Sequence, residues 1–316
     1  MSELYFSSDR VKLYRGDVLD GLRHLADESV QTVVTSPPYW GLRDYGVEGQ
    51  LGLEPTPEEY VDRMVEIFAE VRRVLKADGT LWLNMGDSYA NDYKWGGATG
   101  GKHASALHGS QIGRAKRRTG LKPKDLVGIP WRVAFALQAD GWYLRQDIIW
   151  HKPNPMPESV RDRCTKAHEY IFLLSKASHY HFDSSAMHEP DSGTDHRRNE
   201  TPEIERGQPG VSPHRGLRKE TGRNGAGRNK RSVWTVPTRP YPGAHFATFP
   251  KKLIEPCIKA GARPGDLVLD PFAGSGTALE VAIDNGCRAV GIEINPKYCE
   301  LIVNRLAQGV FSFGAD

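Results

Sequence analysis

The stretch LVLDPFAGSGTALEVA, residues 267–282, constrains the fold of this chain more than any other. Its short apolar run ends at Asp270, and a loop with Gly274 and Gly276 then leads into a segment with helical spacing. A tight turn between a strand and a helix needs glycine, which frees the backbone and lets a ligand approach closely. Glu293, nineteen residues after Gly274, ends the next apolar run, where an acid can accept hydrogen bonds from both hydroxyls of a ribose. The pattern predicts an α/β fold that binds a nucleoside cofactor.

Short apolar strands alternate with helical patterns along the rest of the chain, which predicts a mostly parallel, Rossmann-like sheet with helices on both faces. The strongest predicted helix spans 56–79, with Thr56 as its cap, Pro57 at its first position and Gly79 as its stop. The other predicted helices are 18–29, 128–141, 249–261, 278–286 and 296–308, and the predicted strands are 11–17, 30–35, 80–87, 142–152, 168–176, 266–270 and 287–295.

The sequence VVTSPPYWGLRDYG, residues 33–46, ends a strand abruptly. Pro37 and Pro38 cannot extend a central strand, because they lack the N–H that the ladder needs. Tyr39 and Trp40 are therefore expected on a rigid loop at the carboxyl end of strand 30–35. Taken alone, this stretch is more typical of a proline turn whose two aromatic side chains fill the core, and a functional loop is the alternative.

Basic charge is concentrated in two glycine-rich segments. Residues 91–124 contain eight Lys or Arg residues against one acid, and residues 206–239 contain nine against one. The formal net charge of the whole chain is only +3, so the remaining residues are acidic on balance. The plain interpretation is a pair of solvated insertions, whereas clustered cations of this kind also indicate contact with a phosphate backbone. This second interpretation predicts a nucleic acid as the partner.

The remaining composition excludes several classes. Four widely spaced cysteines and no CxxC pair argue against a zinc site and a disulfide framework, and they fit a reducing cytoplasm. The histidines form no metal pattern, so no metal site is predicted, and neither a signal peptide nor a membrane span is expected. Cys257 follows a proline, as a cysteine nucleophile would, but its helical surroundings favour a small buried hydrophobe.

Three motifs together resemble the amino-group DNA methyltransferases. DPFAGSGT (270–277) and GIEINPKY (291–298) resemble their S-adenosylmethionine site, and TSPPYW (35–40) resembles their catalytic loop. The catalytic loop precedes the cofactor loop, as in the beta arrangement of that family. Further similarity covers 16–39, 150–176 and 245–258, which is nearly the whole chain. The resemblance implies a single catalytic domain, 1–316, with a basic insertion at 91–124 and a target-recognition region at 184–240.

The same resemblance implies roles for individual residues. Asp17 resembles the acid that accepts from the adenine amine of the cofactor, although an ordinary helix N-cap is an equal alternative. Arg163 belongs to a charged, proline-rich loop expected near DNA, unless it pairs with Asp162. The full set comprises catalytic Ser36, Pro37, Pro38 and Tyr39; cofactor-binding Asp17, Thr35, Phe246, Thr248, Asp270, Pro271, Phe272, Gly274, Ser275, Gly276, Thr277 and Glu293; and DNA-binding Trp40, Arg163, Arg228, Lys230 and Arg231.

The chemistry explains why a catalytic loop would use these residues. The exocyclic amine of cytosine or adenine is a poor nucleophile, because its lone pair is delocalised into the ring. The Ser36 hydroxyl and the Pro37 carbonyl can accept its hydrogens, and the prolines fix both acceptors before substrate arrives. Tyr39 can stack on the base, which must first leave the duplex.

These expectations define one function and its rivals. We expect a site-specific DNA methyltransferase that uses S-adenosylmethionine to modify the N4 amine of cytosine, since serine in this loop accompanies cytosine in the resembled family. Adenine N6 is the alternative base. A catalytically silent DNA-binding relative and a nicotinamide-dependent reductase are the rival classes, although Leu279, at the position of a third glycine, argues against a dinucleotide. A prokaryotic cytoplasmic monomer or homodimer, paired with a cognate restriction endonuclease, completes the expectation.

Overall fold

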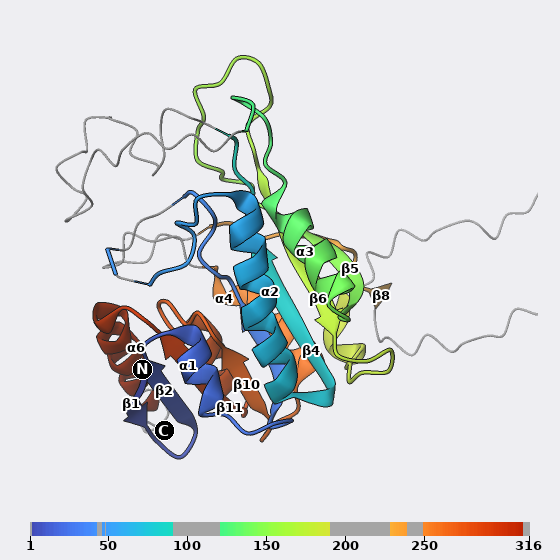
Figure 1. Cartoon of the computed structure of the whole chain (residues 1–316). Coiled ribbons are helices and arrows are strands. Elements are labelled where there is room, and N and C mark those ends of the chain that lie inside the picture. Colours follow the sequence, from blue (N-terminus) through green and yellow to red (C-terminus); the bar gives the residue numbers. More distant parts are fainter. Residues whose placement is uncertain are drawn as a thin grey trace, which may run out of the picture.

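The computed structural model describes residues 2–42, 46–47, 49–90, 121–189, 228–238 and 249–311. Within these residues the main element is a nine-stranded sheet in the order β1-β2-β11-β10-β3-β4-β6-β5-β9 (Figure 1). The strands are β1 (Glu3–Ser7), β2 (Val11–Arg15), β3 (Val30–Thr35), β4 (Leu75–Met85), β5 (Tyr143–His151), β6 (His168–Ser175), β9 (Val233–Thr235), β10 (Leu267–Asp270) and β11 (Arg288–Glu293).

The five central strands, β2, β11, β10, β3 and β4, all pair in parallel, which confirms the predicted mostly parallel sheet. Strand β6 pairs antiparallel with both β4 and β5, whereas β9 is parallel to β5. As a consequence, the carboxyl ends of the central strands, the end of β5 and the start of β6 meet at one edge of the sheet. This edge carries the candidate site.

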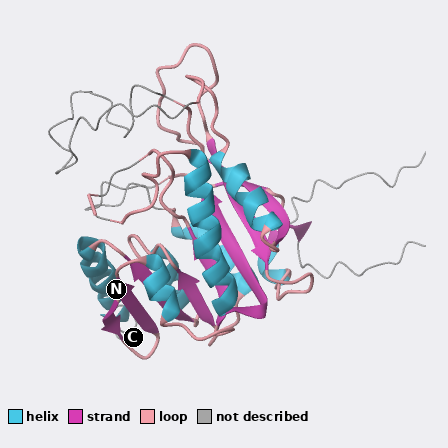
Figure 2. Cartoon of the chain, viewed as in Figure 1, coloured by secondary structure: helices cyan, strands magenta, loops and turns pink. Residues whose placement is uncertain are grey.

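Helices cover both faces of the sheet (Figure 2). Helices α1 (Val18–Arg23), α2 (Pro57–Val74) and α3 (Ile129–Ala139) contribute to one hydrophobic core, and α4 (Lys251–Gly261), α5 (Thr277–Asp284) and α6 (Pro296–Phe311) to the other. Cys257 is 1% exposed in α4, and burial raises the pKa of its thiol, so the structure supports the predicted role of a buried hydrophobe.

Helix α2 shows how local sequence defines an element. The Thr56 hydroxyl accepts a hydrogen bond from the Glu59 amide, and Pro57 occupies the first turn, as predicted. The predicted stop at Gly79 is wrong, because the helix ends at Val74 and β4 begins at Leu75. A Cβ at Gly79 would lie 2.5 Å from the Leu75 side chain, so this glycine is required by close packing inside the strand. Helix α1 is also shorter than predicted.

The chain continues from β3 and from β10 toward opposite sides of the sheet. Helix α2 leads from β3 to its neighbour β4, and α5 leads from β10 to its neighbour β11 on the other side. Because β3 and β10 lie side by side, a crevice opens between their carboxyl ends, where ligands bind in open α/β sheets. Catalytic and cofactor loops predicted from the sequence follow these two strands.

The basic segments are only partly described. Most of the predicted insertion 91–124 and most of the predicted target-recognition region 184–240 lie outside the described residues. The described parts of the second region form β7 (His188–Glu189), β8 (Arg228–Asn229) and strand β9, which belongs to the main sheet. Among the helices described, none combines the length and the apolar character needed to cross a membrane.

Candidate active site

A cavity of about 340 Å³ lies in the crevice between the carboxyl ends of β3 and β10. One part of its wall comes from the cofactor loop and the end of β11, and another from the catalytic loop. The predicted site residues that line it are Asp17, Ser36, Pro37, Pro38, Tyr39, Asp270, Pro271, Phe272, Gly274, Ser275, Thr277 and Glu293. Thus the fold brings the two predicted loops to one cavity, although 235 residues separate Thr35 from Asp270.

A hydrogen bond joins the two strands at this point. The Thr35 hydroxyl donates to Asp270 Oδ1 over 2.6 Å, and the Phe272 amide donates to the same oxygen over 3.1 Å. Asp270 is 1% exposed, and burial raises the pKa of its carboxyl to about 7 despite these two donors. The hydrogen bond between Thr35 and Asp270 therefore holds together the starting points of the catalytic loop and the cofactor loop.

Glu293 fixes the glycine loop from the neighbouring strand. Its Oε2 accepts from the Gly274 amide and its Oε1 from the Asn295 amide, both over 2.8 Å. Burial raises the pKa of the carboxyl to about 7. A carboxylate has about four lone-pair positions, so these backbone amides leave room for a ribose hydroxyl to donate to it. Gly274 adopts a φ of 52°, a left-handed conformation that favours glycine. This agrees with the tight turn predicted from the sequence.

Arg305 of α6 supports the same loop, and sequence reasoning missed it. Its guanidinium donates to the Ser275 carbonyl over 3.0 Å and to the Thr277 hydroxyl over 3.0 Å, and it forms an ion pair with Glu280. A helical periodicity shows only that Arg305 lies on α6. Its role depends on how α6 packs against the start of α5.

Asp17 forms the helix N-cap that was one of the two alternatives proposed for it, and it also faces the cavity. Its Oδ1 accepts from the Leu19 and Asp20 amides at the start of α1, which is an ordinary N-cap. Asp17 also lines the cavity, directly after β2. The cap orients the carboxylate, while the cofactor role stays a prediction. Phe246 and Thr248, also predicted to line the cofactor, lie outside the described residues.

The catalytic loop is anchored by buried contacts beneath it. The Tyr60 hydroxyl of α2 donates to the Pro38 carbonyl over 2.8 Å, and the Trp40 indole N–H donates to the Glu54 carbonyl over 3.0 Å. Trp40 is only 3% exposed and belongs to the core. This corrects the expectation that Trp40 contacts DNA: in this conformation its ring supports the loop from within.

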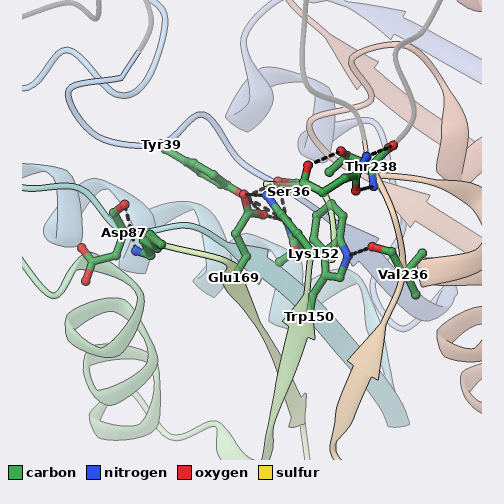
Figure 3. A network of polar contacts seen from close by, with 11 residues as sticks. Ser36, Tyr39, Asp87, Trp150, Lys152, Glu169, Val236 and Thr238 are labelled. Carbon is green, nitrogen blue, oxygen red and sulfur yellow. Dashed lines mark hydrogen bonds and ion pairs between the residues drawn. The ribbon is translucent and has the colours of Figure 1, made fainter. Parts of the chain in front are cut away.

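Ser36 and Tyr39 belong to a polar network shown in Figure 3. Ser36 Oγ donates to the Tyr39 hydroxyl over 3.3 Å, and the Tyr39 hydroxyl donates to Glu169 Oε2 over 2.8 Å. Asn84 Nδ2 lies within 3.3 Å of all three oxygens, and Lys152 forms an ion pair with Glu169 Oε1. Asn84, Lys152 and Glu169 also line the cavity and were not predicted as site residues.

Pairing within the sheet explains why these residues meet. Asn84 is the penultimate residue of β4, Glu169 is the second residue of β6, and Lys152 follows β5. The register places Met85 opposite Tyr170 and Trp150 opposite Glu169, so all three side chains reach the same edge. The sequence block 150–176 was linked to the family by resemblance, but its antiparallel pairing was not predicted.

Comparisons with known proteins show the family of this chain. A family model described as DNA methylase, of the N6 and N4 class, matches residues 30–304. The chain belongs to this family. It is 49% identical to the type II methyltransferase M.XycI of Xanthomonas campestris pv. cyanopsidis over 294 residues, which cover 93% of this chain and 87% of the relative. This membership confirms the family and rules out the nicotinamide-dependent reductase that the sequence left as a rival.

Two solved structures share the fold of this DNA methylase. PvuII DNA methyltransferase, which is cytosine-N4-specific, gives a TM-score of 0.65 at 20% identity and covers 96% of this chain and 88% of its own. TTHA0409 of Thermus thermophilus, a putative DNA modification methylase complexed with S-adenosyl-L-methionine, gives 0.59 at 24% identity and covers 95% of this chain and 94% of its own. These likenesses confirm the predicted methyltransferase fold.

The basic residues predicted to bind DNA are already engaged within this DNA methylase. Arg228 and Arg231 both form ion pairs with Glu189, over 2.9 and 2.8 Å, and Lys230 Nζ lies 5.2 Å from the centre of the Trp234 ring. These residues come before β9, which is parallel to β5 and runs toward the edge of the sheet that carries the cavity. They therefore lie farther from that edge than the end of β9. Their DNA role therefore stays a prediction.

We expect the triple change of Arg228, Lys230 and Arg231 to glutamine to weaken DNA binding and to flatten its salt dependence by up to about three units, near one unit for each phosphate that is no longer neutralised. Fluorescence anisotropy on duplex DNA at several salt concentrations measures both quantities. Glu189→Gln is the matched opposite change, because it releases the two arginines and should steepen the salt dependence. Equal slopes for all three proteins would identify the cluster as structural.

Arg163, also predicted to bind DNA, lies in a loop beside the cavity, and its DNA role likewise stays a prediction. The loop from Lys152 to Ala167 joins β5 to β6 at the edge of the sheet that carries the cavity. The Arg163 guanidinium lies 3.9 Å from the centre of the Tyr89 ring and forms an ion pair with Glu158 over 2.7 Å. Asp162 pairs with Lys124 over 2.6 Å, so the alternative Asp162–Arg163 pair does not account for either residue.

Proposed function

We propose that this protein is a site-specific DNA methyltransferase that modifies the N4 amine of cytosine in duplex DNA and serves in restriction-modification. S-adenosylmethionine is the methyl donor, and it supplies an electrophilic methyl group when bound. The observation that carries this proposal is the position of Ser36, which lies on the same cavity as Asp270 and Glu293. An amine held at Ser36 is therefore next to the half of the cavity that we assign to the donor.

The cofactor half of the cavity fits S-adenosylmethionine. Glu293 keeps acceptor positions for ribose hydroxyls, and the Asp17 carboxylate follows the adjacent strand β2. Gly274 lines the cavity, and a Cβ added there would meet only the Phe272 carbonyl oxygen, 3.8 Å away, so the loop is not crowded at this position. Phe272 is partly buried against the core and lines the cavity, where its ring can cover an adenosine.

Ser36 acts on the amine in this proposal. Its oxygen accepts one hydrogen bond from Asn84 Nδ2 and donates its own hydrogen to Tyr39, so one lone pair stays available for an amine hydrogen. The Pro37 carbonyl takes the second hydrogen. Holding both hydrogens makes the nitrogen more pyramidal and localises its lone pair for attack. Tyr39 lines the cavity beside Ser36, where it stacks on the flipped base.

The choice of cytosine rests on Ser36 as a neutral acceptor and on the family pattern in which serine accompanies cytosine. The fold likeness to a cytosine-N4-specific enzyme is consistent with this choice. Adenine N6 is the second candidate, because its amine is conjugated in the same way. The relatives of this chain are type II methyltransferases, which supports a modification enzyme acting beside a restriction endonuclease.

Product analysis tests the proposal directly. Unmodified phage DNA is incubated with the protein and S-adenosylmethionine, digested to nucleosides and analysed by mass spectrometry. We expect N4-methylcytosine and no enzyme-dependent N6-methyladenine or C5-methylcytosine. N6-methyladenine as the sole product would overturn the base assignment and keep the class. If the donor binds but no methylated base forms on any DNA, the catalytically silent relative is correct.

A further inference from the structure

A continuous hydrogen-bond path leads from Ser36 to a carboxylate. Ser36 Oγ donates to the Tyr39 hydroxyl over 3.3 Å, and that hydroxyl donates to Glu169 Oε2 over 2.8 Å. Both hydroxyl hydrogens therefore lie along a path that ends at the Glu169 carboxylate. Capture of a base by stacking and by acceptor atoms does not require a carboxylate at the end of such a path.

The reaction itself requires a proton acceptor. The amine lone pair forms the new nitrogen–carbon bond, and the electron pair of the broken carbon–sulfur bond stays on sulfur. The methylated amine then carries one proton too many and one positive charge, so it must lose a proton to become the neutral product. Ser36 is the group assigned to hold an amine hydrogen, and it can pass a proton on only if its own hydroxyl proton leaves.

We propose that Glu169 is the terminal proton acceptor of the reaction, reached through Ser36 and Tyr39. An amine proton passes to Ser36 Oγ, the Ser36 hydroxyl proton passes to the Tyr39 oxygen, and the Tyr39 hydroxyl proton passes to Glu169 Oε2. Ser36 and Tyr39 regain their original composition, and Glu169 becomes a neutral carboxylic acid. This inference rests on the proposed function and adds to it the destination of the proton.

The neighbouring residues fit this role for Glu169. Lys152 pairs with Oε1, which leaves Oε2 to face Tyr39. The side chains of Lys152 and Glu169 are only 17% and 16% exposed, so the pair is largely shielded from bulk water. Burial, together with the Glu169 charge, raises the pKa of Tyr39 well above its ordinary value. The resting Tyr39 hydroxyl is therefore protonated, and its proton is available for transfer to Glu169.

Asn84 cannot take the place of Glu169. Its Nδ2 lies 3.3, 2.8 and 3.1 Å from the oxygens of Ser36, Tyr39 and Glu169, which share its two hydrogens. An amide has no carboxylate to neutralise, so it orients the path without accepting the proton. In this respect Asn84 is a positioning residue for the three oxygens.

The test uses two substitutions that interrupt the path at different atoms. Glu169→Gln keeps the shape and one acceptor oxygen but removes the carboxylate, and Tyr39→Phe keeps the stacking ring but removes the hydroxyl. Single-turnover methylation is measured on a synthetic duplex with the site that sequencing maps on phage DNA methylated by the wild type. The target base is mispaired, which lowers the cost of flipping. Each substitution should lower the rate by about 100-fold, within the range for general acid–base catalysis.

The double variant and a solvent isotope effect separate proton transfer from simple support. The double variant should be no slower than either single one, because both break the same path. The wild-type rate should fall in deuterated water, and both variants should lose this effect. Calorimetry should show unchanged affinity for S-adenosylmethionine. Glu70→Gln, which alters an ion-paired carboxylate on α2 outside the cavity, is the matched control and should keep the wild-type rate.

Two outcomes would overturn the proposal. One is a Glu169→Gln or Tyr39→Phe protein that methylates at the wild-type rate; the other is a pair of rate reductions that multiply in the double variant. If Glu169→Gln does not fold, Tyr39→Phe alone decides through its rate and isotope effect. A wild-type protein that methylates no DNA at all would instead show that the proposed function fails, so the two failures are distinguishable.

Discussion

Ser36→Ala is expected to lower the single-turnover rate of methyl transfer by about 10–1000-fold, the range for loss of one positioned polar group in a water-excluded site. The substitution removes the acceptor for the amine hydrogen and also the first member of the path toward Glu169. The structural cost should be small, because Ser36 is half-buried and Asn84 Nδ2 keeps Tyr39 and Glu169 as partners. Rapid-quench measurement of methyl incorporation gives the rate.

The affinity for S-adenosylmethionine should not change in the same variant, because Ser36 makes no hydrogen bond with the cofactor loop in the described structure. Ser29→Ala is a matched control that removes one hydroxyl hydrogen bond, to the Ala26 carbonyl, in an exposed turn. It should methylate at the wild-type rate. A Ser36→Ala protein as fast as this control would remove Ser36 from the chemistry.

Glu293→Ala should weaken S-adenosylmethionine binding by about 1.5–3 kcal/mol, the scale of hydrogen bonds to a charged group. Two effects contribute: the ribose hydroxyls lose their acceptor, and the Gly274 amide loses the partner that holds the loop. Calorimetry measures the affinity, and Glu70→Ala on α2 serves as the control. Unchanged affinity in a folded Glu293→Ala protein would exclude Glu293 from the site.

The raised pKa of Glu293 adds a pH dependence to this prediction. Because its pKa is about 7 in the folded protein, the carboxyl is largely protonated at lower pH. Ribose hydroxyls donate best to the ionised form, so affinity should increase as pH rises through about 7, with release of a proton on binding. Glu293→Gln should remove this dependence. Calorimetry in buffers of different ionisation enthalpy measures the released proton.

The same shifts make the folded protein less stable at higher pH. Asp270 and Glu293 both have pKa values of about 7 in the folded state, above those of an unfolded chain. The folded state therefore binds more protons than the unfolded state. The contribution of Asp270 and Glu293 to the free energy of unfolding is fully present below the pKa values that they have in the unfolded chain. It is lost as pH rises from about 4 to about 7. Bound S-adenosylmethionine should offset part of this loss by binding the folded state.

Local patterns in the sequence specify the cofactor half of the site. The apolar run ending at Asp270, the glycines after it and Glu293 at the end of the next run are all encoded over fewer than thirty consecutive residues. Backbone geometry at this turn admits few alternatives, so the loop forms where the sequence predicts it. The prolines after Thr35 likewise end β3 for a local reason, the missing N–H.

The surroundings of the catalytic loop, in contrast, depend on how distant parts of the chain pack together. Glu169 reaches Tyr39 across 130 residues, because β6 inserts antiparallel between β4 and β5, and no periodicity in the sequence specifies that order of strands. The burial of Trp40 in the core and the pairing of Arg228 with Glu189 also depend on how separate parts of the chain pack together. Burial and long-range pairing depend on which surfaces meet after folding, so residue type alone could not separate a buried tryptophan or a paired arginine from one that faces DNA.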